Sequence, residues 1–283
     1  MDIHIVLDSI SAAEETVLKD DPRCHILPLV VRHGNQEWFD GERSVEELFQ
    51  MIEASGQLPQ TSQPPVGHML ELLTGLVKEG KQVIFITVDS ILSGTYQTAC
   101  MVARQVMDEV KGADIRVIDS KTAACPICGI ALELLEKTAA GMTLDEAEAY
   151  GLDLVKRTES YFSVNTLEYL HKGGRIGAVG ALIGSIFGIR PIVHLDPEGK
   201  LEVADKCRTR KKVLKRMVEL ASAAAPFEAI FVAHAAATQD AEGLKAEMEA
   251  LYPGIPVMLT GIGTVLAAHL GPGVIGLFVR RRP

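Results

Sequence analysis

Aromatic residues and basic charge are both scarce in this sequence of 283 residues. Phe, Trp and Tyr make up 5% of the chain, and 28 Lys and Arg residues face 37 Asp and Glu residues, which gives a formal net charge of -9. Proteins that bind nucleic-acid backbones usually carry basic surfaces, so nucleic acid is not expected as a partner. With so few aromatic rings, an apolar pocket is expected to have aliphatic walls, which favours flexible aliphatic ligands over stacked bases.

Long uninterrupted hydrophobic runs are also missing. The stretch 177–189 is shorter than the ~20 residues that span a bilayer, and the stretch 261–279 is interrupted by His269 and by Gly271-Pro272-Gly273. The chain begins with an acidic residue at position 2 and shows no secretory signal. We therefore expect a cytoplasmic protein, and its 47% of hydrophobic residues suffice for a sizeable core.

Cysteine is sparse and odd in number, as is typical of reduced thiols. The five cysteines are Cys24, Cys100, Cys125, Cys128 and Cys207. Cys125-Pro-Ile-Cys128 follows a predicted strand and begins a helix, where the pKa of a thiol is lowered, so a thiol-disulfide redox function is one alternative. Against it, six residues separate the strand from Cys125 and no Trp precedes the pair. Two structural cysteines are the simpler interpretation, and no zinc-type double pair is present.

The first half of the chain alternates between short apolar stretches and amphipathic stretches. We predict strands at residues 4–7, 26–31, 83–88 and 115–118, and helices at residues 44–54, 67–78, 95–110 and 129–139. A further helix, at residues 143–158, opens with Thr143 and Glu146 at the spacing of a capping box. This alternation predicts a parallel sheet with helices on both faces.

The second half shows a different order of elements. Strands are predicted at residues 161–165, 191–195, 229–233, 257–260 and 274–279, with one more starting near Leu201, and helices at residues 167–172, 178–187, 210–224 and 241–251. The chain length suits one large domain or two of ordinary size. We predict two α/β domains, an N-terminal one at 1–158 and a C-terminal one at 159–283.

Three of the predicted strands end in Asp followed by Ser. The pairs are Asp8-Ser9, Asp89-Ser90 and Asp119-Ser120. The ends of parallel strands share one edge of the sheet, where open α/β sheets bind ligands. Capping of the next helix is the commonest use of such residues. A sharper alternative is a Mg²⁺-dependent phosphatase in which the three aspartates hold the metal, although Ser and not a second acid follows each of them.

Two hydroxyl-rich segments precede predicted helices. Ser93 is the predicted N-cap of one helix, and Gly94 beside it lets a ligand approach the main chain. Thr61 and Ser62 stand before two prolines at the start of another helix. Hydroxyls and free N–H groups at a helix start suit one anionic head group, such as a carboxylate or a phosphate. A plain helix cap explains the same residues.

Two further segments place a charged or titratable residue beside glycines. Gly173-Gly174 ends a predicted helix and precedes Arg175, which is placed either to reach a carboxylate or to stay solvated. His269 lies in an otherwise apolar stretch before the turn Gly271-Pro272-Gly273. A lone histidine in such a stretch is more often a buried structural residue than an active one.

Taken in order, these motifs resemble the DegV family over nearly the whole chain. In the N-terminal half they are Asp8-Ser9, Leu27-Pro28-Leu29, Phe39-Asp40-Gly41, Thr61-Ser62-Gln63-Pro64, Leu92-Ser93-Gly94-Thr95-Tyr96 and Asp119-Ser120. In the C-terminal half they are Leu167-Glu168-Tyr169-Leu170, Gly173-Gly174-Arg175-Ile176, Arg190-Pro191-Ile192, Gly199, Arg208-Thr209 and His269-Leu270-Gly271-Pro272-Gly273. Each motif is weak alone, and together they are specific.

The resemblance implies a two-domain α/β protein with a fatty acid in a tunnel between the domains. The carboxylate-binding residues that it implies are Thr61, Ser62, Ser93, Gly94, Arg175 and His269. The tail-lining residues that it implies, on the predicted helix at 178–187, are Ala178, Leu182 and Ile186.

Better-studied members of the family resemble the acyl-carrying subunit of bacterial fatty acid kinase. There, a separate ATP-binding subunit similar to dihydroxyacetone kinase phosphorylates the bound carboxylate to an acyl phosphate. The present sequence has no Gly-x-x-x-x-Gly-Lys-Ser/Thr phosphate loop and no Gly-x-Gly-x-x-Gly opening its first helix, which fits a carrier better than a self-sufficient enzyme. We expect a long-chain fatty acid as ligand, such a kinase subunit as partner, and neither a cofactor nor a metal.

Basic residues are dense between Lys206 and Arg216, against the acidic whole. Such runs are usually solvated helix faces. The sharper hypothesis is a docking surface for an acidic partner or for anionic lipid head groups, and the resemblance singles out Arg208 as a contact with the kinase subunit. The terminal run Arg280-Arg281-Arg282 suits a transient contact with a membrane surface.

Overall fold

The computed structural model describes residues 2–182 and 188–283, which form two compact units. Unit 1 comprises Met1–Val30, Phe39–Gly41 and Ser62–Lys156. Unit 2 comprises Val31–Trp38, Glu42–Thr61 and Arg157–Pro283. The units are therefore discontinuous in sequence. The continuous domain limits 1–158 and 159–283 stay a prediction, because a grouping of contacts does not show which segments fold independently.

Unit 1 is built on a parallel sheet, as the alternation of strands and helices predicted. Its strands are β1 (Ile3–Asp8), β2 (Cys24–Leu27), β6 (Gln82–Thr87) and β7 (Ile115–Asp119), in the order β2-β1-β6-β7. All three neighbouring pairs run parallel. Every residue of β1 is buried, which is typical of a parallel strand covered on both faces.

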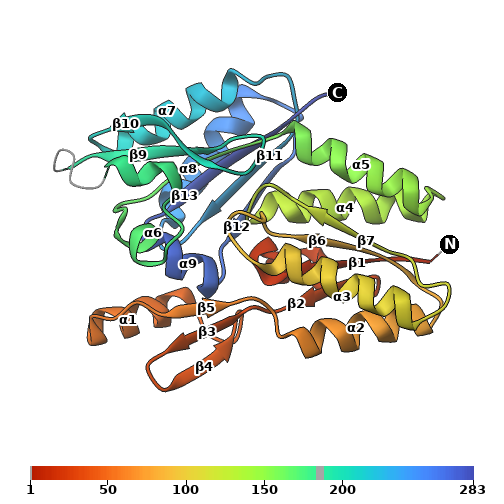
Figure 1. Ribbon diagram of the computed structural model, residues 1–283. Helices are drawn as coiled ribbons and strands as arrows, with labels where there is room; N and C mark the ends of the chain where they lie inside the picture. The colour runs from red at the N-terminus through yellow and green to blue at the C-terminus, as the bar shows by residue number, and fades with distance from the viewer. Residues whose placement is uncertain (1, 183–187) are drawn as a thin grey trace. The chain divides into compact units, whose positions relative to one another are not determined.

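Helices cover both faces of this sheet. They are α2 (Val66–Lys78), α3 (Thr95–Glu109), α4 (Cys125–Ala139) and α5 (Leu144–Arg157). Figure 1 shows α2 and α3 on one face and α4 on the other. Val6 and Phe85 of the sheet pack against Met69 and Leu73 of α2 and Val102 of α3 in one buried cluster. The 3-10 helices η1 (Ser9–Ser11), η2 (Ala13–Glu15) and η3 (Val17–Asp20) connect β1 to β2.

One predicted strand of the first half is wrong. The stretch at 26–31 is divided between β2 and β3 (Val30–His33), with Pro28 in the gap. Proline has no N–H for a sheet ladder, so the continuous strand ends there. β3 pairs instead with β4 (Gln36–Phe39) and β5 (Gln60–Ser62) in a small sheet of order β4-β3-β5.

Two helices begin with capping boxes. Helix α1 (Val45–Ser55) opens with Ser44, whose hydroxyl accepts from the N–H of Glu47 while the Glu47 carboxylate accepts from the N–H of Ser44. The predicted box of Thr143 and Glu146 forms at the start of α5 in the same way. Both helices therefore start within one or two residues of their predicted limits.

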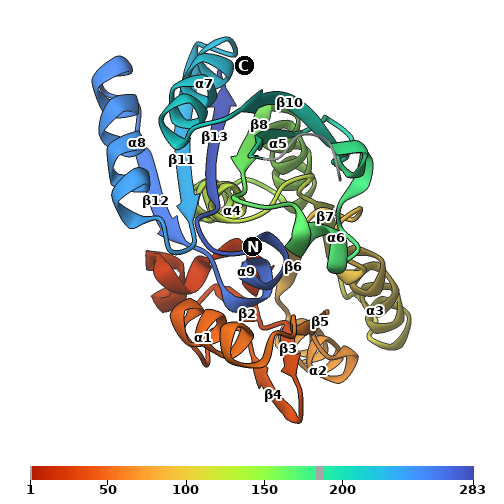
Figure 2. The same ribbon diagram turned by 90° about the vertical axis from the view of Figure 1, so that its left-hand side faces the viewer.

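Unit 2 contains a mixed sheet. Its strands are β8 (Thr158–Ser163), β9 (Arg190–Leu195), β10 (Leu201–Cys207), β11 (Phe227–His234), β12 (Val257–Gly261) and β13 (Ile275–Arg281), in the order β10-β9-β8-β13-β11-β12. Neighbours run antiparallel except β11 and β12, which are parallel. Helices α7 (Arg210–Ser222) and α8 (Thr238–Leu251) lie side by side against it (Figure 2). Met217 of α7 and Met248 of α8 are buried against Ile230 and Leu277.

Three short helices of unit 2 contain or adjoin the motifs around Arg175 and His269. They are α6 (Glu168–Lys172), the 3-10 helix η4 (Gly177–Leu182) and α9 (Thr264–Leu270). The described part of the helix predicted at 178–187 is 3-10 and not α-helical, and its remainder, including Ile186, lies outside the described residues. Helix α9 was not predicted, because a seven-residue apolar stretch between glycines gives no clear period. None of the helices in residues 2–182 and 188–283 is long and apolar enough to cross a lipid bilayer.

Candidate functional site

Thr61 and His269 are hydrogen-bonded within unit 2, although 208 residues separate them in the sequence. The Thr61 hydroxyl oxygen lies 2.7 Å from Nε2 of His269. Thr61 is in the middle of the short strand β5, and His269 is in the last turn of α9. The family resemblance assigned both residues to one head group, and the structure brings these two side chains together.

The sequence suggested that Thr61 and Ser62 begin a helix, but in the structure they do not. Both lie in strand β5, and the next helix, α2, starts four residues after Ser62 with Pro65 as its N-cap and no side-chain cap. The prolines therefore separate the hydroxyls from the helix start. Ser62 is exposed and belongs to unit 1, whereas Thr61 belongs to unit 2.

His269 is neutral at physiological pH. Burial, and after it the positive charge of Arg175, lowers the pKa of His269 from its usual 6.5 to about 4. The second ring nitrogen, Nδ1, is buried and has no hydrogen-bond partner in the part of the chain that the structure describes. The histidine thus orients the Thr61 hydroxyl through Nε2, and the permanent positive charge beside it comes from Arg175.

The titration of His269 should be visible by NMR. We expect its imidazole to titrate near pH 4 in the folded protein and near ~6.5 in urea. Because the folded pKa is the lower one, the neutral histidine favours the folded state above pH 6.5, and this contribution is lost as the pH falls toward 4. A midpoint above 6 in the folded protein would contradict the burial of this ring.

Arg175 lies in the turn after helix α6. Its Nη1 donates a hydrogen bond to the carbonyl oxygen of Gly173, 2.7 Å away, while the side chain as a whole stays exposed. The N–H of Arg175 donates to the carbonyl oxygen of Leu170, which closes the turn. Gly174 has a φ of +73°, the left-handed conformation that ends many helices. The glycine pair therefore forms the tight turn that the sequence predicted.

Two residues that the sequence did not single out hold the loop after His269. Nδ2 of Asn165 donates to the carbonyl oxygen of Pro272 at 2.9 Å, and Nη1 of Arg210 donates to that of Gly273 at 2.8 Å. Arg210 is itself paired with Asp240 at 2.6 Å. Asn165 lies two residues before the Leu-Glu-Tyr-Leu segment, but this spacing gave no indication of its contact with the loop.

In unit 1, the loop before α3 gathers hydroxyls. The Ser93 hydroxyl lies 2.9 Å from that of Thr95 and accepts from the N–H of Thr95 at 3.3 Å. Ser93 is not the N-cap, because that position is taken by Gly94. Gln63 accepts from the Thr98 hydroxyl at 2.9 Å, and its oxygen lies 3.0 Å from where a Cβ on Gly94 would stand. A side chain at Gly94 would therefore displace Gln63.

The aspartates at the strand ends bind main-chain N–H groups. Asp8 accepts from Val88 at 2.7 Å and from Ile10 at 3.1 Å, and burial raises the pKa of its carboxyl to about 7. Asp89 accepts a hydrogen bond from the N–H of Ile91 at 3.0 Å. Asp119 accepts one from the N–H of Ser90 at 3.1 Å. Only Asp8 caps the element that follows it, the 3-10 helix η1; the N-caps of α3 and α4 are Gly94 and Ala124. Within residues 2–182 and 188–283, no three His, Cys, Asp or Glu side chains are grouped as metal ligands.

The cysteine pair does not have the character of a redox site. Cys125 and Cys128 are fully buried in α4. Sγ of Cys128 donates to the carbonyl oxygen of Ser11. Burial, with Cys125 and Cys24 nearby, raises the pKa of the Cys128 thiol well above its usual value. The lowered thiol pKa that the helix start had suggested is therefore wrong for Cys128.

Thiol labelling checks this arrangement. In the folded protein we expect Ellman's reagent to react with the partly exposed Cys100 and Cys207 only, and with the buried cysteines after unfolding in guanidinium. Rapid labelling of Cys125 or Cys128 before unfolding, mapped by peptide mass spectrometry, would restore the redox alternative.

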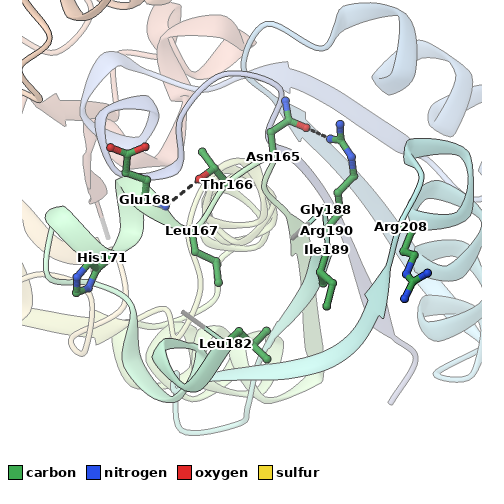
Figure 3. Close-up of a pocket in the computed structure, with 10 residues that line it drawn as sticks. All are labelled: Asn165, Thr166, Leu167, Glu168, His171, Leu182, Gly188, Ile189, Arg190 and Arg208. Carbon is green, nitrogen blue, oxygen red and sulfur yellow. Dashed lines mark hydrogen bonds between the residues drawn. The ribbon is translucent and has the colours of Figure 1, made fainter. Parts of the chain in front are cut away.

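A pocket of about 630 Å³ lies within unit 2, between the segment around α6 and strand β9. Its apolar lining residues are Leu167, Leu182 and Ile189. Figure 3 shows Arg190 turned toward Asn165, whose side-chain oxygen accepts a hydrogen bond from it, and Arg208 on the other side of the pocket from His171. The pocket thus has both apolar walls and guanidinium groups. Ala178, another residue implied for the tail, is exposed.

Much of the basic run in unit 2 is neutralised by acidic neighbours. Arg216 pairs with Asp205 at 2.5 Å and with Glu219 at 2.9 Å, in addition to the pair of Arg210 with Asp240. Arg208 is exposed just beyond the end of β10. The run is therefore mixed in charge, and Arg208 is one of its exposed members.

Comparisons with known proteins agree on one family. A family model described as "Uncharacterised protein, DegV family" matches residues 2–282. Protein DegV of Bacillus subtilis is 31% identical over 284 residues, which cover 98% of this chain and 98% of that protein. The solved structure of a fatty-acid-binding DegV family protein from Thermus thermophilus matches with a TM-score of 0.89 at 26% identity, covering 99% of both chains.

A second solved structure supports the same assignment. DegV of Bacillus subtilis, described as a fatty acid binding protein, matches with a TM-score of 0.85 at 28% identity, again covering 99% of both chains. Both folds and both sequences are matched along their full length, and the motifs lie in the expected order. The chain therefore belongs to the DegV family.

Proposed function

We propose that this protein binds a long-chain fatty acid and presents its carboxylate to a separate ATP-dependent kinase subunit. The observation that carries the first half is the cluster of Thr61, His269 and Arg175 in unit 2. A hydroxyl, a neutral imidazole and a guanidinium suit a carboxylate, and the similar proteins of Thermus thermophilus and Bacillus subtilis are fatty-acid-binding proteins. The protein is then a carrier and not an enzyme by itself.

The head group is held by hydrogen bonds and one positive charge. Arg175 supplies the charge-assisted hydrogen bonds that an ionised carboxylate prefers. Thr61 donates its hydroxyl proton to the ligand when Nε2 of His269 donates in turn to the Thr61 oxygen. Ser62, Ser93 and Gly94 are assigned to the same carboxylate by the family resemblance alone, and their part stays a prediction.

The acyl tail supplies most of the binding energy. Each CH₂ removed from water stabilises the complex by ~0.8 kcal/mol. The resemblance assigns Ala178, Leu182 and Ile186 to the tail, and Leu182 lines the pocket of unit 2 with other aliphatic residues. Aliphatic lining accepts a flexible chain without a need for aromatic stacking.

In the second half of the proposal, the partner supplies ATP. A carboxylate oxygen attacks the γ-phosphorus, the bond between that phosphorus and the bridging oxygen breaks, and ADP leaves, which yields the acyl phosphate. The carrier contributes orientation of the attacking oxygen. Arg208 is assigned to docking of a dihydroxyacetone-kinase-like subunit. Exposed basic residues suit transient contact with an anionic membrane surface, but Arg280 of the terminal run is buried and takes no part.

Mass spectrometry of lipid extracted from protein purified without detergent tests the carrier function. We expect a stoichiometric long-chain fatty acid, and a marked loss of it in Thr61→Val and Ser93→Ala. Thr74→Val and Ser222→Ala, which make the same changes on helices α2 and α7, should retain it. A protein that comes off empty and takes up no added oleate would refute the proposal.

The kinase step has its own test. With oleate-loaded protein, ATP and a dihydroxyacetone-kinase-like subunit, hydroxylamine should trap the acyl phosphate as a hydroxamate. Arg208→Glu should lower this yield by more than it lowers oleate binding, which is measured in parallel because Arg208 also lines the pocket of unit 2. If oleate binds but no hydroxamate forms, the carrier function stands and the kinase partnership falls.

Neither alternative function is favoured. The fully buried thiols of Cys125 and Cys128 oppose thiol-disulfide exchange. The carboxylates of Asp8, Asp89 and Asp119 already accept main-chain hydrogen bonds, which leaves fewer oxygen lone pairs for Mg²⁺.

A further inference from the structure

Gly173 lies directly against the imidazole of His269, closer than any side chain permits. A Cβ built on Gly173 would stand 2.4 Å from Nδ1 and 3.2 Å from Cε1 of His269, whereas favourable contacts between such atoms start near ~3.5 Å. The φ of Gly173 is -74°, a value that every residue adopts. The glycine is therefore needed for space and not for backbone conformation.

This contact matters because hydrogen bonds from the described part of the chain hold the ring at one nitrogen only. Nε2 of His269 is hydrogen-bonded to Thr61, but Nδ1 has no hydrogen-bond partner among the described residues. A ring held at one nitrogen can swing about that bond, and packing against its other edge removes the freedom. Because Gly173 has no side chain, the His269 ring can pack directly against the main chain at this position.

The same glycine anchors Arg175. The carbonyl oxygen of Gly173 accepts the hydrogen bond from Nη1 of Arg175, and the charge of Arg175 acts on His269. One residue thus contacts two members of the proposed head-group cluster, the imidazole through its Cα and the guanidinium through its carbonyl. A shift of Gly173 alters both at once.

Neighbouring glycines make close contacts of a different kind. A Cβ on Gly271 would stand 2.6 Å from the Tyr169 ring, and one on Gly273 would stand 2.0 Å from Nδ2 of Asn165. Both have positive φ, +75° and +81°, so any side chain there strains the backbone as well. Of these three glycines, Gly173 is the one at which a side chain is excluded by lack of space while the backbone conformation would allow it.

We propose that Gly173 is a positioning residue of the head-group site: its missing side chain lets the His269 ring, and through it the Thr61 hydroxyl, take the arrangement that binds a carboxylate. The ligand part of this inference rests on the proposed function. The part about the imidazole does not, because it concerns the protein without ligand.

Gly173→Ala and Gly174→Ala form a matched pair of variants for the test. A Cβ on Gly174 meets no atom within 4 Å, but its φ of +73° strains the same turn.

In delipidated protein we expect Gly173→Ala to weaken oleate binding by at least about tenfold. It should also raise the NMR midpoint of His269 from about 4 toward the ~6.5 of a solvated histidine. Gly174→Ala should lower the thermal midpoint and leave the His269 titration and the oleate affinity unchanged.

A double-mutant cycle with His269→Ala isolates the contact. Without the ring, the affinity loss caused by Gly173→Ala should shrink to what the remaining close contact causes, which is with the main-chain carbonyl oxygen of Tyr169 at 2.9 Å. An unchanged His269 midpoint in Gly173→Ala, or an affinity loss that persists in full without the ring, would overturn the proposal.

The remaining outcomes are also decisive. If the wild-type protein binds no oleate, the proposed function fails, and the His269 midpoint alone decides whether Gly173 positions the ring. If Gly173→Ala fails to fold but the double variant folds, the clash is with His269 and the positioning role stands. If both fail to fold, the clash lies with Tyr169 and the role falls.

Discussion

Replacing Glu228 by Gln should lower the free energy of unfolding by about 1.5–3 kcal/mol, because one partly exposed carboxylate pairs with two buried guanidiniums. Oε1 of Glu228 lies 2.5 Å from Nη1 of Arg157 and 3.1 Å from Nε of Arg280. Arg280 is only 2% exposed and lies over the Phe231 ring. With a neutral amide in place of the carboxylate, two positive charges would remain buried without their shared counter-ion.

Urea denaturation measures this effect, with Glu242→Gln as the control. Glu242 is exposed on α8, so the same change of charge there should alter the free energy of unfolding by less than about 0.5 kcal/mol. A loss below 1 kcal/mol in Glu228→Gln would mean that water or a relaxed neighbour compensates the two arginines.

Replacing Arg175 by Gln should weaken the binding of oleate by roughly 10- to 150-fold, which is the loss of a charge-assisted hydrogen bond worth about 1.5–3 kcal/mol. Arg175 is the positive charge that acts on His269, and its guanidinium is already oriented by the carbonyl oxygen of Gly173. Lysine keeps the charge but cannot form the same paired hydrogen bonds. The oleate affinity of Arg175→Lys should therefore lie between those of the wild type and Arg175→Gln.

Displacement of a fluorescent fatty acid from delipidated protein gives these affinities. Arg104→Gln, which removes an exposed arginine on α3, serves as the control and should bind oleate as the wild type does. The difference between Arg175→Gln and wild type should shrink for a fatty alcohol, which has no charge to pair. An Arg175→Gln variant with unchanged affinity for oleate would remove Arg175 from the head-group site.

Local signals in the sequence predicted most elements of the fold. Apolar strands followed by amphipathic helices indicated the parallel sheet, and the capping-box spacing of Thr143 and Glu146 marked the start of α5. These signals act within a few residues, and their physics is that of caps, turns and burial on one face. The failures were local too, since the break at Pro28 divides one predicted strand between two sheets.

The candidate site was predicted by resemblance and not by local chemistry. Ser93, Thr61 and His269 each had a simpler structural explanation, and the caps expected at Ser93 and Thr61 did not form. Nothing in the spacing of Asn165 or Arg210 indicated that they hold the loop after His269. Such contacts join segments about 60 to 110 residues apart. The periodicity of hydrophobic residues predicts local helices and strands, and it does not predict which distant segments meet.

The sequence by itself determined most of the elements, the parallel sheet of unit 1 and the family, because those depend on short-range patterns and on motif order. Only the tertiary structure decided which chemistry the motifs share. It set Thr61 against His269, buried Cys125 and Cys128, and placed Gly173 where a methyl group does not fit. Hydrogen bonding, desolvation and steric exclusion act over a few ångströms in space, and the folded chain alone determines which residues come that close.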